Sequence, residues 1–286
     1  MASFDEIHAV ARARLFALAY RMLGSRAEAE DALQEGFLRL HAAGRETVRD
    51  PLAWLVTVVT RLCLDRLRNL AAERAAYAGP WLPEPLVDAV PPPDADAADR
   101  TDDLSLAFTL LLERLAPEER AAFLLHEALG QGHTEIATAL GRSEAASRQL
   151  LHRARRRLRD AGRQAQAPEA VKRRMVQRYL TALRTGDASG LLALLAEDAV
   201  LVSDGGGKVA AAPRPVEGAV RIARLELGLR RKPRFAVTEE GLGIVNGEPG
   251  ILAWRDGALI AATALETDGE RILTLWRVLN PDKLRG

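Results

Sequence analysis

The chain has 286 residues, of which 48% are hydrophobic and 28% are charged, and its formal net charge is +1. A chain of this size and composition can bury real cores and is long enough for two or three small domains. Its only cysteine, Cys63, excludes an intrachain disulfide. The N-terminus is acidic where a signal peptide is basic, and no 18 apolar residues run without a charge. We therefore expect a protein of the reducing cytoplasm with no membrane partner.

The charge is distributed unevenly along the chain. Between Arg142 and Arg163 there are eight arginines against Glu144 and Asp160, a local net charge of +6. Such a cluster is typical of a nucleic-acid-binding surface. Residues 87–103, "VDAVPPPDADAADRTDD", are acidic, proline-rich and poor in apolar side chains, which predicts a linker.

The sequence predicts three compact segments and one linker. Residues 1–78 and 105–163 carry apolar residues at helical spacing, and residues 79–104 join them. Residues 168–286 mix helices, expected near 168–185, 188–196 and 217–230, with alternating strand-like runs. Arg-Asp-Gly and Thr-Asp-Gly punctuate those runs as hairpin turns and predict an antiparallel sheet. The fold class is therefore two all-α domains followed by an α+β domain.

The first notable helix begins at a capping box formed by Ser25 and Glu28 and extends to about His41. Its predicted inner face consists of Ala29, Ala32, Leu33, Gly36 and Leu40. Its opposite face carries Asp31, Gln34, Glu35 and Leu38. An outward leucine among acids is either incidental or part of a protein-binding surface, and the helix by itself leaves both readings open.

A second helix begins at Asp50 and Pro51, which suit the N-cap and first helical positions. One of its faces repeats at three or four residues: Trp54, Thr57, Arg61, Asp65 and Arg68. An aromatic ring interleaved with arginines suits unstacked bases and the phosphates beside them. The alternative is a buried tryptophan beside solvated charges.

Residues 133–160 predict a helix-turn-helix, with a glycine turn at Gly141 and a second helix capped by Ser143. Its predicted inner stripe is Leu150, Leu151, Ala154 and Leu158, interrupted by the polar Ser147. Its outward residues are placed to read bases and bind phosphates: Ser143, Ala145, Arg148, Gln149, His152, Arg153 and Arg156. DNA binding is favoured over a merely solvated face because spacing, cap and charge agree.

The stretch Asp204, Gly205, Gly206, Gly207, Lys208 first suggests a phosphate-binding loop. A Walker A loop requires Gly-x-x-x-x-Gly-Lys-Ser/Thr, but Val202 replaces its first glycine and Val209 replaces its hydroxyl. No metal site is expected either, because His126 and Glu127 are followed by Gly130 where a zinc-binding motif needs histidine. No cofactor is predicted.

Together these residues resemble the extracytoplasmic-function (ECF) group of bacterial RNA polymerase sigma factors. Residues 19–40 are similar to region 2.1 to 2.2, residues 50–68 to region 2.3 to 2.4, and residues 115–158 to region 4. The resemblance implies that Asp31, Gln34, Glu35 and Leu38 bind the polymerase core at the beta-prime clamp, and that region 4 meets the beta flap. It also implies that region 4 reads the −35 promoter element. The resemblance further implies that the −10 promoter element is bound by Trp54, Thr57, Thr60, Arg61, Asp65 and Arg68.

Three further stretches resemble the ECF41 subgroup, in which a SnoaL-like or NTF2-like extension follows region 4. They are "WLPEP" at residues 81–85, of which Trp81, Leu82 and Pro83 are the candidate contact residues; "DGGGK" at residues 204–208; and "NPDKL" at Asn280, Pro281, Asp282, Lys283 and Leu284. The resemblance implies that this extension contacts the sigma core in place of an anti-sigma factor and modulates its activity.

Two other functions remain open for the extension. NTF2-like cups include enzymes, but this segment has no histidine, and acids such as Asp187 and Asp204 form no evident catalytic pair. We therefore do not expect an enzyme. The second alternative is a DNA-binding regulator whose cup senses a small ligand.

Overall fold

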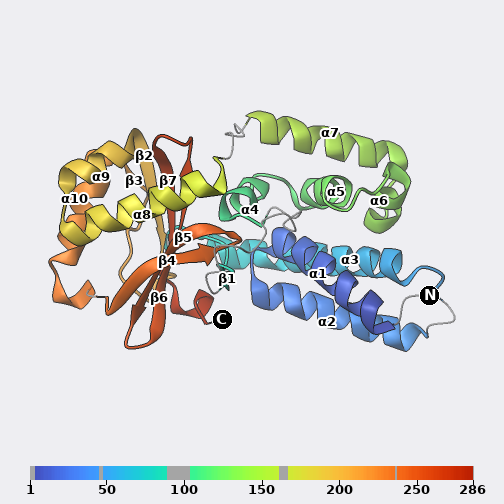
Figure 1. Ribbon diagram of the computed structural model, residues 1–286. Coiled ribbons are helices and arrows are strands. Elements are labelled where there is room, and N and C mark those ends of the chain that lie inside the picture. Colours follow the sequence, from blue (N-terminus) through green and yellow to red (C-terminus); the bar gives the residue numbers. More distant parts are fainter. Residues whose placement is uncertain (1–3, 45–47, 89–103, 161–166, 236, 286) are drawn as a thin grey trace. The chain divides into compact units, whose positions relative to one another are not determined.

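The computed structural model describes residues 4–44, 48–88, 104–160, 167–235 and 237–285. It forms two compact units, each discontinuous in sequence (Figure 1). Unit 1 comprises Met1–Ala75 and Phe108–Arg163, and unit 2 comprises Ala76–Ala107 and Gln164–Gly286. The segment between the two helical parts therefore belongs with the C-terminal part. In the described ranges no helix is both long and apolar enough to cross a membrane.

Unit 1 begins with a three-helix arrangement: α1 (Phe4–Leu23), α2 (Arg26–Ala43) and α3 (Pro51–Ala75). The hydroxyl of Ser25 accepts from the Glu28 amide at 3.4 Å, and the Asp50 carboxylate accepts from the Ala53 amide at 3.0 Å, so both expected N-caps are confirmed. The other half of the expected capping box is not shown, because both oxygens of the Glu28 carboxylate accept from Arg66 at 2.6 Å. The predicted inner face of α2 is also confirmed as buried. Gly36 permits close packing on α3, because a Cβ there would lie 3.0 Å from Val59.

Four shorter helices complete unit 1: α4 (Leu106–Leu112), whose first residues belong to unit 2, α5 (Pro117–Glu127), α6 (His133–Leu140) and α7 (Glu144–Asp160). Gly141 has φ 62° between α6 and α7, a left-handed conformation that favours glycine. The polar Ser147 on the inner stripe of α7 is fully buried, and its hydroxyl lies 3.3 Å from Nδ1 of His133. This contact joins the two helices of the helix-turn-helix.

The two helical parts of unit 1 are joined by the buried Arg120 and the half-buried Arg74. The guanidinium of Arg120, which is 3% exposed, donates to the Met22 carbonyl at 2.6 Å and to Glu113 at 2.8 Å. Arg74 donates to the Leu23 carbonyl at 2.8 Å and also pairs with Glu113. Because buried guanidinium groups need several acceptors, this network specifies how the end of α1 meets α5.

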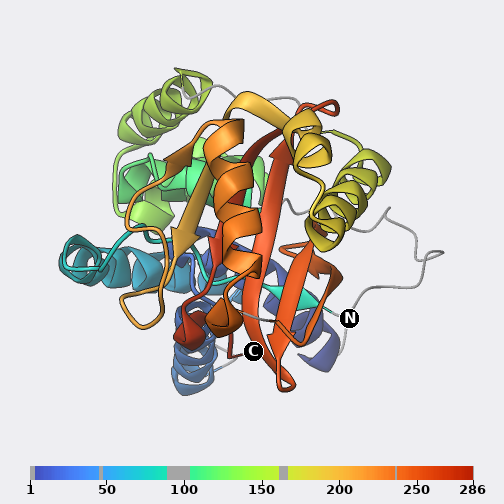
Figure 2. The same ribbon diagram turned by 90° about the vertical axis from the view of Figure 1, so that its left-hand side faces the viewer.

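Unit 2 is a seven-stranded sheet in the order β1-β4-β5-β6-β7-β2-β3. Its strands are β1 (Val87–Asp88), β2 (Leu195–Asp204), β3 (Val216–Glu217), β4 (Glu239–Val245), β5 (Glu248–Arg255), β6 (Ala258–Thr267) and β7 (Ile272–Val278). Helices α8 (Glu169–Thr185), α9 (Ala188–Leu194) and α10 (Ala219–Arg230) pack on one face (Figure 2). The expected α+β class is confirmed.

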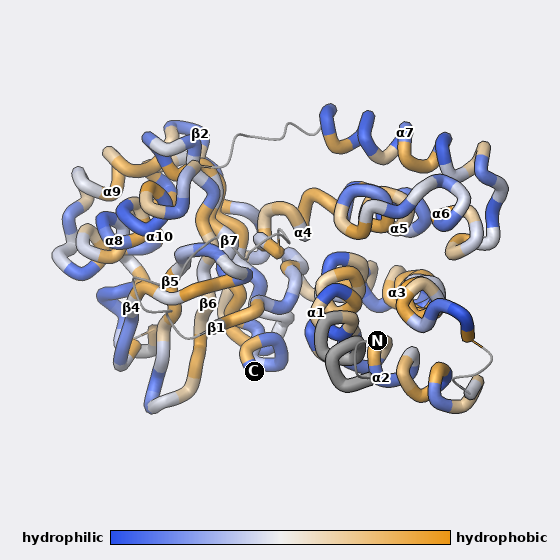
Figure 3. The backbone as a smooth tube through the Cα atoms, turned by 45° about the vertical axis from the view of Figure 1, so that its right-hand side comes forward, coloured by the Kyte–Doolittle hydropathy of each residue, from blue (hydrophilic) through white to orange (hydrophobic). Residues whose placement is uncertain are grey.

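The sheet differs from the expected antiparallel one because β2 pairs with β7 in parallel. The reason is topological: β2 reaches the sheet after two helices and lies beside the last strand, so no hairpin joins the pair. The core beneath the helices is formed by apolar side chains such as Tyr179, Leu191, Ile222 and Leu275. Hydrophobic segments of both units are orange in Figure 3.

The predicted linker contains a short strand. Val87 and Asp88 form β1 and pair antiparallel with Val245 and Ile244 of β4. We name residues 77–88 the linker strap. Most of the acidic stretch, residues 89–103, lies outside the described residues, as do residues 161–166 before Pro168.

Candidate regulatory junction and partner-binding surfaces

The three stretches "WLPEP", "DGGGK" and "NPDKL" meet at one carboxylate, that of Asp204 at the end of β2, which is fully buried. Oδ1 accepts from the Tyr77 hydroxyl at 2.7 Å and from the Gly206 amide at 3.0 Å. Oδ2 accepts from the Leu82 amide at 2.9 Å and from Nζ of Lys283 at 2.7 Å. Four donors therefore satisfy one buried negative charge, so an uncharged side chain at this position would leave buried donors without an acceptor and would destabilise the site. We call this set the Asp204 junction.

Lys283 supplies the positive charge of the junction. Besides Asp204, its Nζ donates to the Leu82 carbonyl at 2.6 Å. The same nitrogen lies 4.5 Å from the centroid of the Trp81 ring and 4.8 Å from that of Tyr77, both within the range of a cation–π contact. The side chain of Lys283 is only 13% exposed, so these contacts replace water around the ammonium group. "WLPEP" thus binds "NPDKL" through both its backbone and its aromatic ring.

The glycines allow the chain to pass close to its partners. Gly206 has φ 58°, and a Cβ there would lie 2.3 Å from Nδ2 of Asn280 and 2.9 Å from the Tyr77 hydroxyl. Gly207 has φ 71°, and a Cβ there would lie 3.0 Å from that of Ala78. The Gly206 amide donates to the Asp204 carboxylate. This backbone donor, which could otherwise bind a phosphate, is therefore already paired with an anion of the chain itself.

Asn280 completes the junction. It is 4% exposed, and its Nδ2 donates to the Tyr77 hydroxyl at 2.8 Å. The backbone amide of Asn280 donates to the backbone carbonyl of Asp204 at 2.9 Å, and its side-chain Oδ1 accepts from the backbone amide of Asp282 at 3.1 Å. Lys208 pairs with Asp282 at the exposed rim, and the hydrogen bond from Lys208 lowers the pKa of that carboxyl below its usual range. Pro83 and Leu284 are also buried.

Tyr77 is the junction residue that the sequence analysis did not single out. Burial, and then its hydrogen bond to Asp204, raise the pKa of its phenol well above the ordinary value. It lies four residues before Trp81, just after α3, and only its position as an aromatic side chain at the start of a predicted linker signalled a packed role.

The expected polymerase-binding residues share the outer face of α2. Asp31, Gln34 and Leu38 are exposed and Glu35 is half-buried. Leu38 is 58% exposed, which is the largest value among the large apolar residues that the structure describes as exposed. Glu35 pairs with Arg39 at 2.6 Å along the same helix. The surface is therefore a single apolar side chain surrounded by acids and an amide.

The residues expected to bind the −10 element differ in their exposure to solvent. Asp65 and Arg68 are exposed and pair with each other at 2.7 Å, while Trp54 and Thr57 are half-buried. Thr60 is fully buried and presents no atom to a DNA strand, so we leave it out of the candidate surface.

Arg61 has a different partner in this structure. Its Nε donates to the Ala139 carbonyl at 2.9 Å, and a terminal nitrogen donates to the Thr138 carbonyl at 2.7 Å. Both carbonyls belong to the last turn of α6, where a cation also interacts favourably with the helix dipole. The expected strand-binding arginine thus holds α3 against the helix-turn-helix.

The outward face of α7 is as expected. Its seven candidate residues are exposed, and the inner stripe of Leu150, Leu151, Ala154 and Leu158 is buried, so hydropathy alternates along this helix (Figure 3). Arg153 pairs at 2.9 Å with the buried carboxylate of Glu119, which supports α5. Arg148 pairs with Glu144 on its own helix. Gln149, His152 and Arg156 make no such contact among the described residues, so their donors remain exposed.

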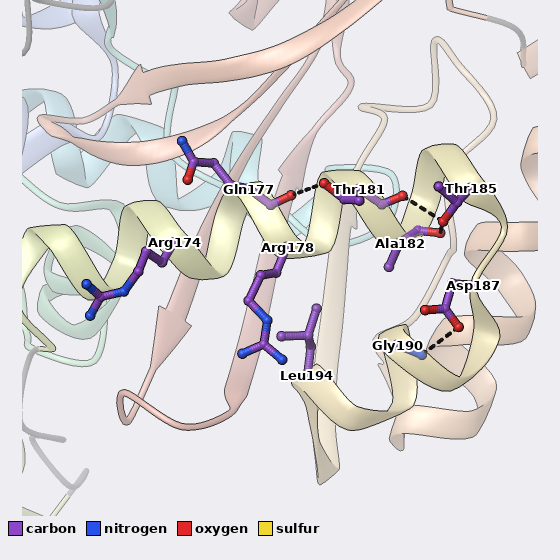
Figure 4. A pocket seen from close by; sticks show the side chains of 9 residues that line it. All are labelled: Arg174, Gln177, Arg178, Thr181, Ala182, Thr185, Asp187, Gly190 and Leu194. Carbon is purple, nitrogen blue, oxygen red and sulfur yellow. Dashed lines mark hydrogen bonds between the residues drawn. The ribbon is translucent and has the colours of Figure 1, made fainter.

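Unit 2 also contains an open hollow of about 410 Å³ between α8 and α9 (Figure 4). Arg174 and Arg178 line it with the hydroxyls of Thr181 and Thr185, which already donate to backbone carbonyls. Asp187 caps α9 by accepting from the Gly190 amide at 2.9 Å. Asp187 and Asp204, the two acids considered for catalysis, are therefore both engaged in structural contacts.

Comparison with known proteins identifies both helical parts. The Sigma-70 region 2 family matches residues 10–73, and the Sigma-70 region 4 family matches residues 105–158. Within the described residues no group of three potential metal ligands occurs.

Full-length relatives agree with these matches. The chain is 37% identical to the ECF RNA polymerase sigma factor SigJ of Mycobacterium tuberculosis, over 96% of this chain and 91% of that protein. It is 33% identical to the probable ECF RNA polymerase sigma factor SigI of the same species, over 96% and 92%. The crystal structure of SigJ matches with a TM-score of 0.78 and covers 98% of both chains. The likeness therefore extends through the C-terminal part.

Proposed function

Since the chain belongs to the ECF sigma factors of bacterial RNA polymerase, which direct the polymerase to specific promoters, we propose that its C-terminal unit regulates this activity by holding the linker between regions 2 and 4. The Asp204 junction is the observation that carries the proposal. In it, Asp204 and Lys283, which form an ion pair, hold Tyr77 and Leu82 by hydrogen bonds and the rings of Tyr77 and Trp81 by cation–π contacts. A separate anti-sigma factor would have to make comparable contacts from outside the chain.

The binding surfaces follow from the same assignment. We propose that Leu38 and its surrounding polar residues dock on the beta-prime clamp, and that region 4 meets the beta flap. The exposed donors of α7 bind the −35 element. The α3 face with Trp54 and Arg68 binds the −10 strand, and Arg61 joins it after leaving the Thr138 and Ala139 carbonyls.

Promoter-dependent run-off transcription with the full chain and core polymerase tests the regulatory role. Asp204→Asn disrupts the junction at its centre, while Asp282→Asn removes an exposed carboxylate that pairs with Lys208 and Arg285. We expect Asp204→Asn to change transcript yield at least threefold and Asp282→Asn to leave it near the original. Equal yields from all three proteins would refute regulation through the junction.

A second candidate function, which we infer from one buried hydroxyl, is ligand sensing by unit 2. The hydroxyl of Tyr179 is fully buried without a well-aligned hydrogen bond, and burial raises its pKa. Nearby, Arg277 pairs with Glu226 at 2.8 Å and donates to Thr263 at 3.1 Å. Such a polar centre in an apolar core suits a small ligand with a hydroxyl or carbonyl. A stabilising thermal shift by such compounds, lost in Tyr179→Phe, is the expected result.

A further inference from the structure

Asn246 joins the two ends of the linker. It lies in the turn between β4 and β5 and is 1% exposed. The backbone amide of Asn246 donates to the Leu86 carbonyl at 2.7 Å, and its side-chain Oδ1 accepts from the Leu86 backbone amide at 3.1 Å. Its Nδ2 donates to the Leu104 carbonyl at 2.9 Å. One side chain thus binds the linker just before residues 87–103 and just after them.

The turn geometry alone does not require these contacts. Asn246 and Gly247 have φ of 53° and 78°, the conformation for which Asn-Gly is preferred in hairpins. Asp256 and Gly257, between β5 and β6, have φ of 52° and 78°, yet Asp256 is exposed. The described residues therefore contain two hairpin turns with this backbone geometry, and of these two the one at Asn246 binds described residues of the linker.

The consequence for the linker is a shorter effective path. Leu86 and Leu104 are 18 residues apart, a stretch that spans roughly 60 Å when extended. Both ends are bonded to one residue, so this length adds nothing to the distance that the linker can bridge. Beyond Leu104, Ser105 and Leu106 are 1% and 2% exposed, so the chain is packed until it enters α4.

We propose that Asn246 is a linker anchor that sets the separation allowed between regions 2 and 4, and thereby determines which promoter spacer lengths the protein accepts. The inference rests on the proposed role of the C-terminal unit and deepens it. With the anchor, about six residues connect Leu82 to Leu106. Without its Leu104 contact, the path from Asp88, which stays paired with β4, to Leu106 is 18 residues long, so about 22 residues make the connection. Because effective concentration falls with roughly the −3/2 power of linker length, the second module then binds about five- to tenfold more weakly.

The test compares Asn246→Gly with Asp256→Gly in the full chain. Glycine keeps the left-handed turn at both positions, and only Asn246→Gly loses side-chain contacts to the linker. Run-off transcription uses promoters whose −35 to −10 spacer is lengthened or shortened by one, two and three base pairs around the optimum. We expect Asn246→Gly to lower the yield at the optimum about five- to tenfold and to flatten the dependence on spacer length. Asp256→Gly should reproduce the original profile.

Hydrogen exchange of the Leu86 amide gives a readout that is independent of polymerase. This amide donates to the Asn246 side chain, so its exchange should accelerate at least tenfold in Asn246→Gly and not in Asp256→Gly. An unchanged spacer profile for Asn246→Gly overturns the anchor proposal, and so does unchanged exchange. The two proposals fail separately: if Asp204→Asn alters transcription while Asn246→Gly keeps the original profile, the junction regulates but Asn246 does not set the spacing.

Discussion

Replacing Asp204 by asparagine probes the centre of the junction with a side chain of nearly the same shape. The four groups around the carboxylate are all donors: the Tyr77 hydroxyl, the Gly206 and Leu82 amides and the Lys283 ammonium. Asparagine has one acceptor oxygen, so in either orientation its NH₂ group faces two donors. The ammonium of Lys283 also loses its buried counter-charge.

The expected cost follows from these losses. Removing one partner of a buried ion pair destabilises by about 3 to 5 kcal/mol. At about 3 kcal/mol, local opening of the strap becomes about 100-fold more frequent. Hydrogen exchange of the Leu82 amide measures this directly, because that amide donates to Asp204. We expect its exchange to accelerate about 100-fold or more at constant pH.

Two comparisons make the experiment decisive. The double variant Asp204→Asn/Lys283→Met removes the unpaired ammonium group and should recover part of the lost protection, giving a coupling of about 2 kcal/mol. Asp282→Asn, which affects an exposed pair, should leave the Leu82 amide as protected as in the original chain. Unchanged exchange in Asp204→Asn would show that the junction is not held by its charge, and the reasoning would be refuted.

Three further predictions concern other contacts. Gly206→Ala should weaken the junction by about 1 to 3 kcal/mol, because φ is 58° and the new methyl meets Asn280 and Tyr77. Unchanged Leu82 exchange in Gly206→Ala would remove the steric argument, and the unfolding free energy of Gly257→Ala, with φ 78° and no atom within 4 Å, measures what a left-handed backbone alone costs. The pKa of Tyr77 is higher in the folded protein than in the unfolded chain, so its contribution to stability is fully present below pH 10 and is lost as pH rises through the folded-state pKa. Tyr77→Phe should therefore reduce the dependence of the unfolding free energy on alkaline pH by up to about 1.4 kcal/mol per pH unit. The same pH dependence in both proteins would contradict this prediction. Arg61→Ala should speed exchange of amides in α6 about tenfold by removing two hydrogen bonds, whereas Arg68→Ala, whose partner is Asp65 on the same helix, should not.

Much of unit 1 was predictable because its helices follow simple local rules. Ser25, Asp50 and Gly141 determine where helices begin or end, and the apolar spacing on α2 and α7 determines which faces are buried. These signals act over three or four residues, so a sequence shows them directly. The partner of Arg61 was not predictable, because its acceptors are backbone carbonyls 77 and 78 residues away.

The junction was predictable only in part. Its three motifs were identified through resemblance, but their common centre was not, since Asp204 accepts from residues more than a hundred positions earlier. Tyr77 and Asn246 were missed because the first lies at the end of a helix and the second in a sequence that a hairpin turn explains fully. Burial of Thr60 was missed because adjacent positions on α3 change quickly from exposed to buried.

The pairing of β1 with β4 has a consequence for solubility. β4 is the penultimate strand of its sheet, and among the described residues the two of β1 pair with its outer edge near Val245. Unpaired edge strands are templates for association with another chain. If the strap were released, this edge of β4 would be open to pairing with another strand.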